Sequence, residues 1–136
     1  MLYIIGIGLG NEKDISLNSL EILKSCTFVY LENYTSRINF NLKRMEELIN
    51  NKIILADRNI VENKAEQILY KSKSRDVAFL VKGDVFSATT HLDLFIRAKK
   101  ENIEVKILHN NSIFTAVGDC GLSLYKFGRV SSIPFD

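Results

Sequence analysis

Residues 2–10 read LYIIGIGLG, and this stretch decides the fold class. Its first six residues form a short and continuously apolar run, which glycines at alternating positions bring to an end. Such a run is typical of a strand that is buried on both faces of a parallel sheet. Glycines after a strand permit positive φ and let the backbone approach a ligand closely. The stretch therefore predicts a buried strand that leads into a ligand-facing loop.

The same pattern recurs along the chain and alternates with helical patterns. Further apolar runs that predict strands occupy residues 27–31, 52–55, 76–81 and 104–108. Helical spacing of apolar residues follows an opening at 14–16 and covers 41–49, 61–73, 90–100 and a last segment from 113. Strands and helices in alternation predict an α/β fold: a five-stranded, mainly parallel sheet with helices on both faces.

The first helix carries the clearest cap and face signals. Asp14 or Ser16 can accept hydrogen bonds from its free N–H groups. Leu17, Leu20 and Leu23 follow at steps of three residues, so we expect them on one apolar face. Asn111 and Ser112 are placed in the same way to cap the last helix.

Composition excludes several classes of protein. The 136 residues are enough for one domain, and their 46% apolar and 25% charged content is ordinary for a globular protein. The net charge of +2 comes without a concentrated basic stripe, and no apolar run approaches the length of a membrane span. Cys26 and Cys120 have neither metal-type spacing nor a disulfide framework. We expect both thiols to be buried and the protein to be cytoplasmic, without direct contact to nucleic acid or membrane.

Polar residues follow the expected strand ends, where parallel sheets bind ligands. Asp84 comes after the fourth strand and can accept hydrogen bonds from ribose hydroxyls or an ammonium group. Ser87 and the threonines after it can hold a carboxylate at the helix start, or they serve only as caps. For His91 we expect a structural role, and for His109 a partly buried and satisfied imidazole.

Glu32 leaves a second class of function open. It lies 22 residues after Gly10, near the position where a dinucleotide-binding fold places its ribose-binding acid. The glycine spacing is G-x-G-x-G rather than G-x-G-x-x-G, however. A nicotinamide-dependent oxidoreductase domain and a non-catalytic nucleotide-binding module therefore remain as alternatives. No metal site is expected from two histidines and two scattered cysteines.

Taken together, four loop motifs resemble the diphthine synthase family, which belongs to the tetrapyrrole-methylase-like superfamily. The motifs are LYIIGIGLG at 2–10, YLENYTS at 30–36, GDVFSATTH at 83–91 and HNNSI at 109–113. The chain departs from the usual pattern at Val85, where a proline is usual, and at Ser87, where a small apolar residue is usual. A backbone contact at position 87 would survive that change.

The resemblance implies the N-terminal domain of a class III-type methyltransferase. Such enzymes transfer methyl groups from S-adenosylmethionine to the 3-amino-3-carboxypropyl group on a modified histidine of translation elongation factor 2, in diphthamide biosynthesis. S-adenosylhomocysteine is the product, and a homodimer is expected. Carried over by motif, the cofactor-binding residues are Leu9, Asp84, Ser87, Ser112 and Ile113. The residues expected on the substrate side are Glu32, Tyr34, Thr35 and Ser36.

Two further expectations follow from the resemblance. Glu32 or a water is a candidate to take the proton of the acceptor amine. Residues 1–128 would form the cofactor-binding domain, and residues 129–136, which contain the lone Pro134, would begin a connector to a second domain. On that basis we expect the isolated chain to fold, to bind S-adenosylmethionine weakly and not to methylate.

Overall fold

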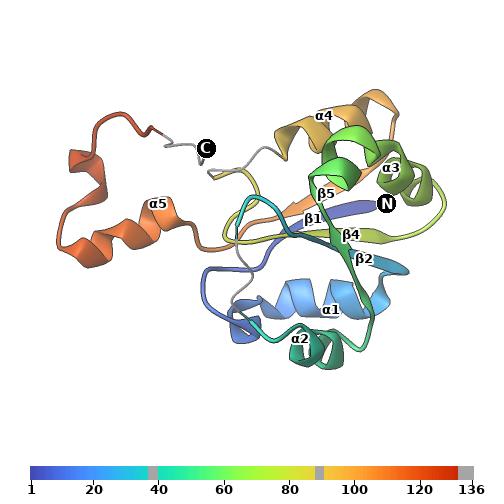
Figure 1. Ribbon diagram of the computed structural model, residues 1–136, viewed down its shortest axis with the longest axis horizontal. Coiled ribbons are helices and arrows are strands. Elements are labelled where there is room, and N and C mark those ends of the chain that lie inside the picture. The colour runs from blue at the N-terminus through green and yellow to red at the C-terminus, as the bar shows by residue number, and fades with distance from the viewer. Residues whose placement is uncertain (37–39, 88–90, 132–136) are drawn as a thin grey trace.

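The computed structural model describes residues 1–36, 40–87 and 91–131, and these residues form the expected α/β fold (Figure 1). The strands are β1 (Leu2–Gly6), β2 (Phe28–Glu32), β3 (Ile53–Ala56), β4 (Val77–Val81) and β5 (Val105–Leu108). They form one sheet in the order β3-β2-β4-β1-β5, and every pairing between them is parallel. The predicted five-stranded parallel sheet is confirmed.

Helices join the strands, and short turns supplement them. The α-helices are α1 (Leu17–Ser25), α2 (Leu42–Ile49), α3 (Ala65–Ser72), α4 (Leu92–Lys100) and α5 (Ile113–Ala116). Single turns occupy Glu12–Asp14, Asn59–Asn63, Val117–Cys120 and Leu124–Lys126. None of the described helices is long and apolar enough to cross a bilayer.

The sheet is covered on both faces, as Figure 1 shows: α1 and α2 lie on one side, and α3 and α4 on the other. Leu23 of α1 and Met45 of α2 are fully buried in the first core. Ile68 of α3 and Leu94 of α4 are buried in the second core, on the opposite face. Because β4 is central and covered on both faces, all five of its residues are buried.

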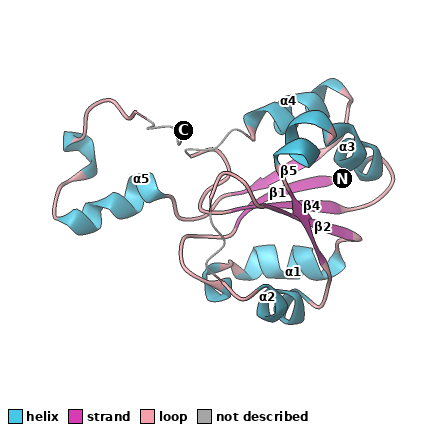
Figure 2. Cartoon of the chain, in the orientation of Figure 1, coloured by secondary structure: helices cyan, strands magenta, loops and turns pink. Residues whose placement is uncertain are grey.

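Strand register brings the loops of interest to one edge of the sheet. Gly6 at the end of β1 pairs with Val81 at the end of β4, and Ile5 pairs with Leu108 at the end of β5. Figure 2 shows the loops that leave these strand ends gathered between the sheet and α5. The carboxyl ends of β1, β4 and β5, where the sequence predicts ligand binding, therefore lie together at one edge of the sheet.

The first helix begins where the sequence indicates, but its buried face differs from the prediction. Ser16 is its N-cap and accepts a hydrogen bond from the N–H of Ser19 at 3.1 Å. Leu17 is 80% exposed, and the buried residues of α1 are Ser19 and Leu23. Two steps of three residues rotate a side chain by about 120° around a helix, so Leu17 lies off the face that holds Leu23.

Two other expectations need correction. The helix expected over 61–73 is divided, because Lys64 leaves helical geometry (φ −121°, ψ 24°) between the turn Asn59–Asn63 and α3. Cys26 is buried as expected, whereas Cys120 is exposed. The reason is that residues 118–131 pack against no part of the sheet and are all exposed. Thr89, Thr90 and the connector residues 132–136 lie outside the described residues.

Candidate functional site

Two glycine loops are joined across the carboxyl edge of the sheet. Gly8 donates its N–H to the carbonyl of Gly83 at 3.2 Å, and Gly83 donates back to Gly8 at 2.9 Å. Both residues have φ of +77°, which only glycine adopts without strain. A Cβ on Gly6 would lie 2.6 Å from the carbonyl oxygen of Gly83, so the loops meet at backbone contact.

Asn110 fixes the third loop to the first. Its Nδ2 donates to the carbonyls of Gly6 (3.0 Å) and Asp14 (3.1 Å). Asp14, one of the two expected helix caps, instead accepts a hydrogen bond from the N–H of Gly10 at 2.6 Å. The loops after β1, β4 and β5 are therefore held as one rigid unit before any ligand binds.

Asp84 is the centre of this unit. Its Oδ1 lies 2.8 Å from Nδ1 of His109 and accepts from the N–H of Asn110 at 3.1 Å. Its Oδ2 accepts from the N–H of Phe86 at 3.2 Å and from the hydroxyl of Ser87 at 3.1 Å. A carboxylate offers about four acceptor positions, so the internal contacts occupy all of them.

The charge of Asp84 is stabilised by these contacts. Desolvation raises the pKa of the carboxyl, but the hydrogen bonds from His109, Asn110, Phe86 and Ser87 outweigh it, and the pKa lies below its ordinary value. The side chain is only 9% exposed, whereas that of His109 is 67% exposed. His109 is therefore paired as expected but lies at the surface, and it is the donor that a ligand can most easily displace.

The other residues expected to bind the cofactor lie on the same three loops or at the start of α5. Leu9 is half-buried and its Cδ2 lies beside Gly83, 3.5 Å from the position of a Cβ there. Ser112 is buried and caps α5 by accepting from the N–H of Phe114 at 3.1 Å. Ile113 is 54% exposed. Four of the five residues predicted for the cofactor lie on the three joined loops, and Ile113 follows the third loop as the first residue of α5.

The residues expected on the substrate side form a second cluster, on the other side of β4. Glu32 ends β2 and is 1% exposed. Its Oε1 accepts from the N–H groups of Tyr34 (2.7 Å) and Thr35, so the carboxylate shapes the turn that follows the strand. Thr35 is exposed and Ser36 is half-buried in this turn. The arrangement leaves Thr35 at the surface and Glu32 inside.

Strand order weighs against the dinucleotide alternative. In a dinucleotide-binding fold the acid lies at the end of the strand next to the glycine loop. Here β4 separates β2 from β1, and Glu32 is buried behind its own turn. The carboxylate is therefore in the wrong place to hold a ribose bound at the glycine loop.

The sequence analysis expected a structural role for His91 but did not indicate its environment. It is fully buried and packs edge-on against Phe79 and Tyr34, with ring centroids 5.2 and 6.1 Å away. Burial lowers the pKa of its imidazole, and the nearby Glu32 carboxylate opposes that shift. A lone histidine in a loop carries no sequence signal for such an environment. Its place beside Glu32 depends on the pairing of β2 with β4.

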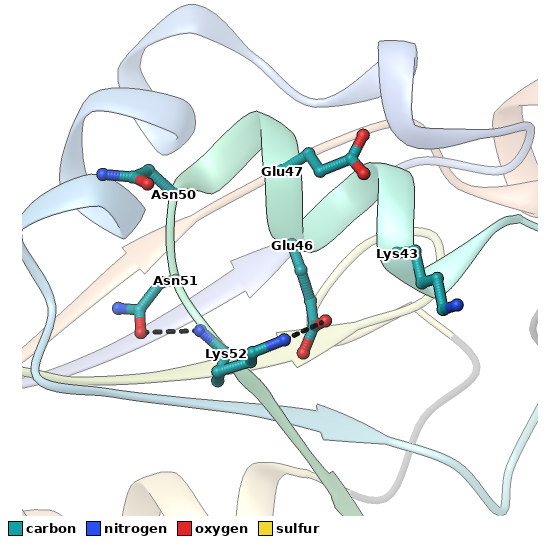
Figure 3. Close-up of a pocket in the computed structure, with 6 residues that line it drawn as sticks. All are labelled: Lys43, Glu46, Glu47, Asn50, Asn51 and Lys52. Carbon is teal, nitrogen blue, oxygen red and sulfur yellow. Dashed lines mark hydrogen bonds and ion pairs between the residues drawn. The ribbon is translucent and has the colours of Figure 1, made fainter.

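A separate hollow lies at the amino end of β3 (Figure 3). It encloses about 560 Å³ between the end of α2 and the start of β3. Glu46 there accepts from Nζ of Lys52 at 3.1 Å and from the N–H of Ile53 at 3.0 Å. The Glu46 side chain thus joins the end of α2 to the start of β3, so this part of the hollow stabilises the α2–β3 turn. Among the described residues no cluster could hold a metal ion.

Comparisons with known proteins agree with this architecture. The family described as Tetrapyrrole (Corrin/Porphyrin) Methylases matches residues 1–134. The diphthine methyl ester synthase of Kluyveromyces lactis is 52% identical over 136 residues, covering 99% of this chain and 46% of the relative. The human diphthine methyl ester synthase is 51% identical over 135 residues, covering 99% and 47%.

A solved structure shows the same similarity in three dimensions. A crystal structure of a diphthine synthase superposes with a TM-score of 0.88 at 35% identity, covering 94% of this chain and 52% of that one. The resemblance to diphthine synthases drawn from the loop motifs is confirmed. The chain spans about half the length of the curated relatives it matches.

Proposed function

The chain belongs to the tetrapyrrole methylase family, and from that premise we propose that it is the cofactor-binding domain of an S-adenosylmethionine-dependent methyltransferase of diphthamide biosynthesis. The proposed acceptor is the 3-amino-3-carboxypropyl-histidine of translation elongation factor 2. The observation that carries the proposal is the set of three loops joined through Gly8, Gly83 and Asp84. Two relatives that are 52% and 51% identical to this chain are named diphthine methyl ester synthases.

The residues on the joined loops suit this cofactor chemically. S-adenosylmethionine carries ribose hydroxyls, an ammonium group and a sulfonium cation, all of which favour a neighbouring carboxylate. Asp84 supplies a carboxylate that its neighbours keep ionised. Leu9 and Ile113 offer apolar surface, and positive-φ Gly83 lets the backbone come close to a ligand. We propose Leu9, Asp84, Ser87, Ser112 and Ile113 as the contacts.

The four internal hydrogen bonds of the Asp84 carboxylate determine how it would bind a ligand. A ribose hydroxyl that donates to this carboxylate must replace one of the four internal donors, since all acceptor positions are occupied. The exposed His109 and the rotatable hydroxyl of Ser87 are the two that can yield. The backbone N–H groups of Phe86 and Asn110 then continue to hold the carboxylate in place.

Positioning is the main chemical task of such a domain. When bound, S-adenosylmethionine supplies a methyl group that is already activated by its sulfonium. The chain's part is to fix the acceptor in line with that group, which lowers the entropic part of the barrier. The rigid loop unit serves the donor side. We propose that Glu32, Tyr34, Thr35 and Ser36 serve the acceptor side, and that residues 1–128 form the domain.

Equilibrium binding tests the proposal. Calorimetric titration of the 136-residue chain with S-adenosylhomocysteine is expected to show saturable binding at one site, and titration with NAD is expected to show none. Asp84→Asn should weaken the binding at least tenfold. Glu47→Gln, in the hollow at the other end of the sheet, is the matched control and should bind like the wild type. Binding of NAD in place of S-adenosylhomocysteine would favour the oxidoreductase alternative.

A turnover assay separates an enzyme from a non-catalytic module. Incubation of a protein that contains this domain with radiolabelled S-adenosylmethionine and unmethylated elongation factor 2 is expected to label the modified histidine. Elongation factor 2 that lacks the aminocarboxypropyl group should stay unlabelled. Cofactor binding without any label transfer would support the non-catalytic alternative.

A further inference from the structure

Leu9 lies between two glycines that the loop after β4 holds by different means. On one side, Gly8 exchanges two backbone hydrogen bonds with Gly83. On the other side, Nζ of Lys82 donates to the carbonyl oxygen of Gly10 at 2.9 Å. Two consecutive residues of one loop therefore hold both neighbours of a residue that we propose as a cofactor contact.

Asp14 holds the other polar group of Gly10. Its Oδ2 accepts a hydrogen bond from the N–H of Gly10 at 2.6 Å. A Cβ on Gly8 would lie 2.6 Å from the Cβ of Asp14, and a Cβ on Gly10 would lie 2.7 Å from its Oδ2. The Asp14 side chain is therefore packed directly against the glycine loop, and the absence of side chains at positions 8 and 10 makes room for it.

The charges of Lys82 and Asp14 support each other. Lys82 is half-buried, and its Nζ lies 5.8 Å from the centroid of the Phe40 ring, within the range of a cation–π contact. Partial burial lowers the pKa of the Lys82 ammonium, and the nearby Asp14 carboxylate opposes that shift. The carboxylate therefore favours the charged form of the lysine, which is the stronger donor to the carbonyl of Gly10.

The two contacts fix the conformation of Gly10. Its N–H belongs to the peptide group before its Cα and its carbonyl to the peptide group after it, so together they restrain both φ and ψ. Glycine has more backbone freedom than any other residue, and Gly10 is exposed. A loop that is already held in its binding conformation loses less conformational entropy when a ligand binds.

We propose that Asp14 and Lys82 are positioning residues, which hold Gly10 in the conformation that presents Leu9 to the cofactor. This inference rests on the proposed function, in which Leu9 contacts S-adenosylmethionine. Neither charged side chain has to touch the cofactor, because each acts through Gly10. Loss of either one releases Gly10 on one side, so the fraction of molecules with a binding-competent loop falls and the apparent Kd rises.

Calorimetric titration of the 136-residue chain with S-adenosylhomocysteine tests the effect on affinity. Asp14→Ala and Lys82→Met should each weaken binding roughly three- to tenfold, the size expected when one hydrogen bond that orders the loop is lost. Lys82→Arg retains a cationic donor and should restore most of the affinity. The double variant should lose less than the product of the two single effects, because both side chains act through the same residue.

A matched pair of controls lies at the other end of the sheet. Glu46 accepts from the N–H of Ile53 at 3.0 Å and from Nζ of Lys52 at 3.1 Å, so it is also a carboxylate that joins a backbone N–H to a lysine. Glu46→Ala and Lys52→Met should leave the affinity for S-adenosylhomocysteine unchanged. Urea denaturation of every variant separates a loss of stability from a loss of binding.

Amide NMR of ¹⁵N-labelled protein provides a second readout that needs no ligand. The Gly10 amide proton, which donates to a carboxylate, is expected far downfield, and Asp14→Ala should move it upfield. Lys82→Met should shift the amide signal of Asn11, whose N–H shares a peptide group with the carbonyl of Gly10. The control variants at Glu46 and Lys52 should leave both signals in place.

The outcomes separate this inference from the proposed function. If the wild type binds S-adenosylhomocysteine and Asp14→Ala and Lys82→Met bind it equally well, the positioning role is wrong and the proposed function stands. Unchanged amide signals of Gly10 and Asn11, or losses that simply multiply in the double variant, would also overturn the positioning role alone. If the wild type does not bind S-adenosylhomocysteine, the proposed function loses its support, and the positioning role is overturned with it.

Discussion

Gly8 and Gly83 exchange both of their backbone hydrogen bonds across the carboxyl edge of the sheet, each in the left-handed region at φ +77°. This bridge connects the loop after β1 to the loop after β4, and Asp84 then connects the second loop to the one after β5. The proposed cofactor site is therefore a consequence of contacts between three loops that are far apart in the chain.

The two glycines of this bridge are expected to differ in their tolerance of a side chain. Gly83→Ala adds a Cβ that meets only ordinary contacts beyond 3.5 Å, so it should cost about 1–2 kcal/mol of the free energy of unfolding from backbone strain alone. Gly8→Ala places its Cβ 2.6 Å from that of Asp14, and overpacking should bring its cost to roughly 2–5 kcal/mol. Urea denaturation measures both. An equal loss of unfolding free energy in the two variants would contradict these Cβ contacts.

Removal of the Asp84 charge should lower stability as well as cofactor binding. Asp84→Asn replaces one acceptor oxygen with an amide that can only donate, so two of the four internal donors lose their partner. We expect a loss of about 1–3 kcal/mol in urea denaturation at pH 7. Ser87→Ala removes only one neutral hydroxyl donor and should cost less. A larger effect of Ser87→Ala would argue against Asp84 as the centre of the unit.

The same carboxyl predicts a pH dependence of stability. Hydrogen bonds lower the pKa of Asp84 in the folded protein below the ordinary value of 3.8. Its stabilisation is therefore fully present above that value and is lost as the pH falls through the folded pKa. The difference in free energy of unfolding between wild type and Asp84→Asn should shrink in acid. Denaturation curves recorded from pH 7 downward give this difference. A difference that grows in acid would contradict a lowered pKa for Asp84.

The two thiols should react at very different rates. Cys26 is 4% exposed, and its burial, with a smaller effect of Asp76, raises the pKa of the thiol to about 11. Cys120 is exposed. Titration with a thiol-specific chromogenic reagent at pH 8 should show one rapid equivalent in the native protein and two in urea. Cys120→Ser should remove the rapid equivalent, and a rapid reaction that survives this change would place Cys26 at the surface.

Glu46 is expected to stabilise the α2–β3 turn through its two acceptor oxygens. The N–H of Ile53, and then Lys52, lower the pKa of its carboxyl below the ordinary value of 4.5, so this contribution is lost as the pH falls through the lowered pKa. Glu46→Ala should lower the melting temperature at pH 7, and Glu46→Gln should retain much of the wild-type value. Thermal denaturation followed by circular dichroism measures both. Glu47→Ala, on the same helix, should be close to neutral.

Local structure was largely predictable from residue types. The strands are continuous apolar runs, because a strand buried on both faces needs apolar residues at every position. Ser16, Asn41 and Ser112 are N-caps because their oxygens accept from free helix N–H groups. The exceptions have local reasons: Leu17 is off the buried face of its helix, and Cys120 lies in a segment that does not pack on the sheet.

The sites themselves were predictable only in part. Loop motifs identified Asp84, but no motif indicates that four internal donors already saturate its carboxylate. Glu32 was expected on the substrate side, whereas its burial and its unpartnered oxygen were not. His91 was expected to be structural, and its two unpartnered nitrogens are visible only once Phe79, Tyr34 and Glu32 surround it.

By itself, the sequence determined the α/β class, the strands, the helix starts and the loops that bear polar residues, since these depend on neighbours along the chain. Only the tertiary structure decided the order β3-β2-β4-β1-β5, because five similarly apolar strands give no local signal for which ones pair. That order inserts β4 between β1 and β2. It places Asp84 beside the glycine loop on one side and His91 near Glu32 on the other.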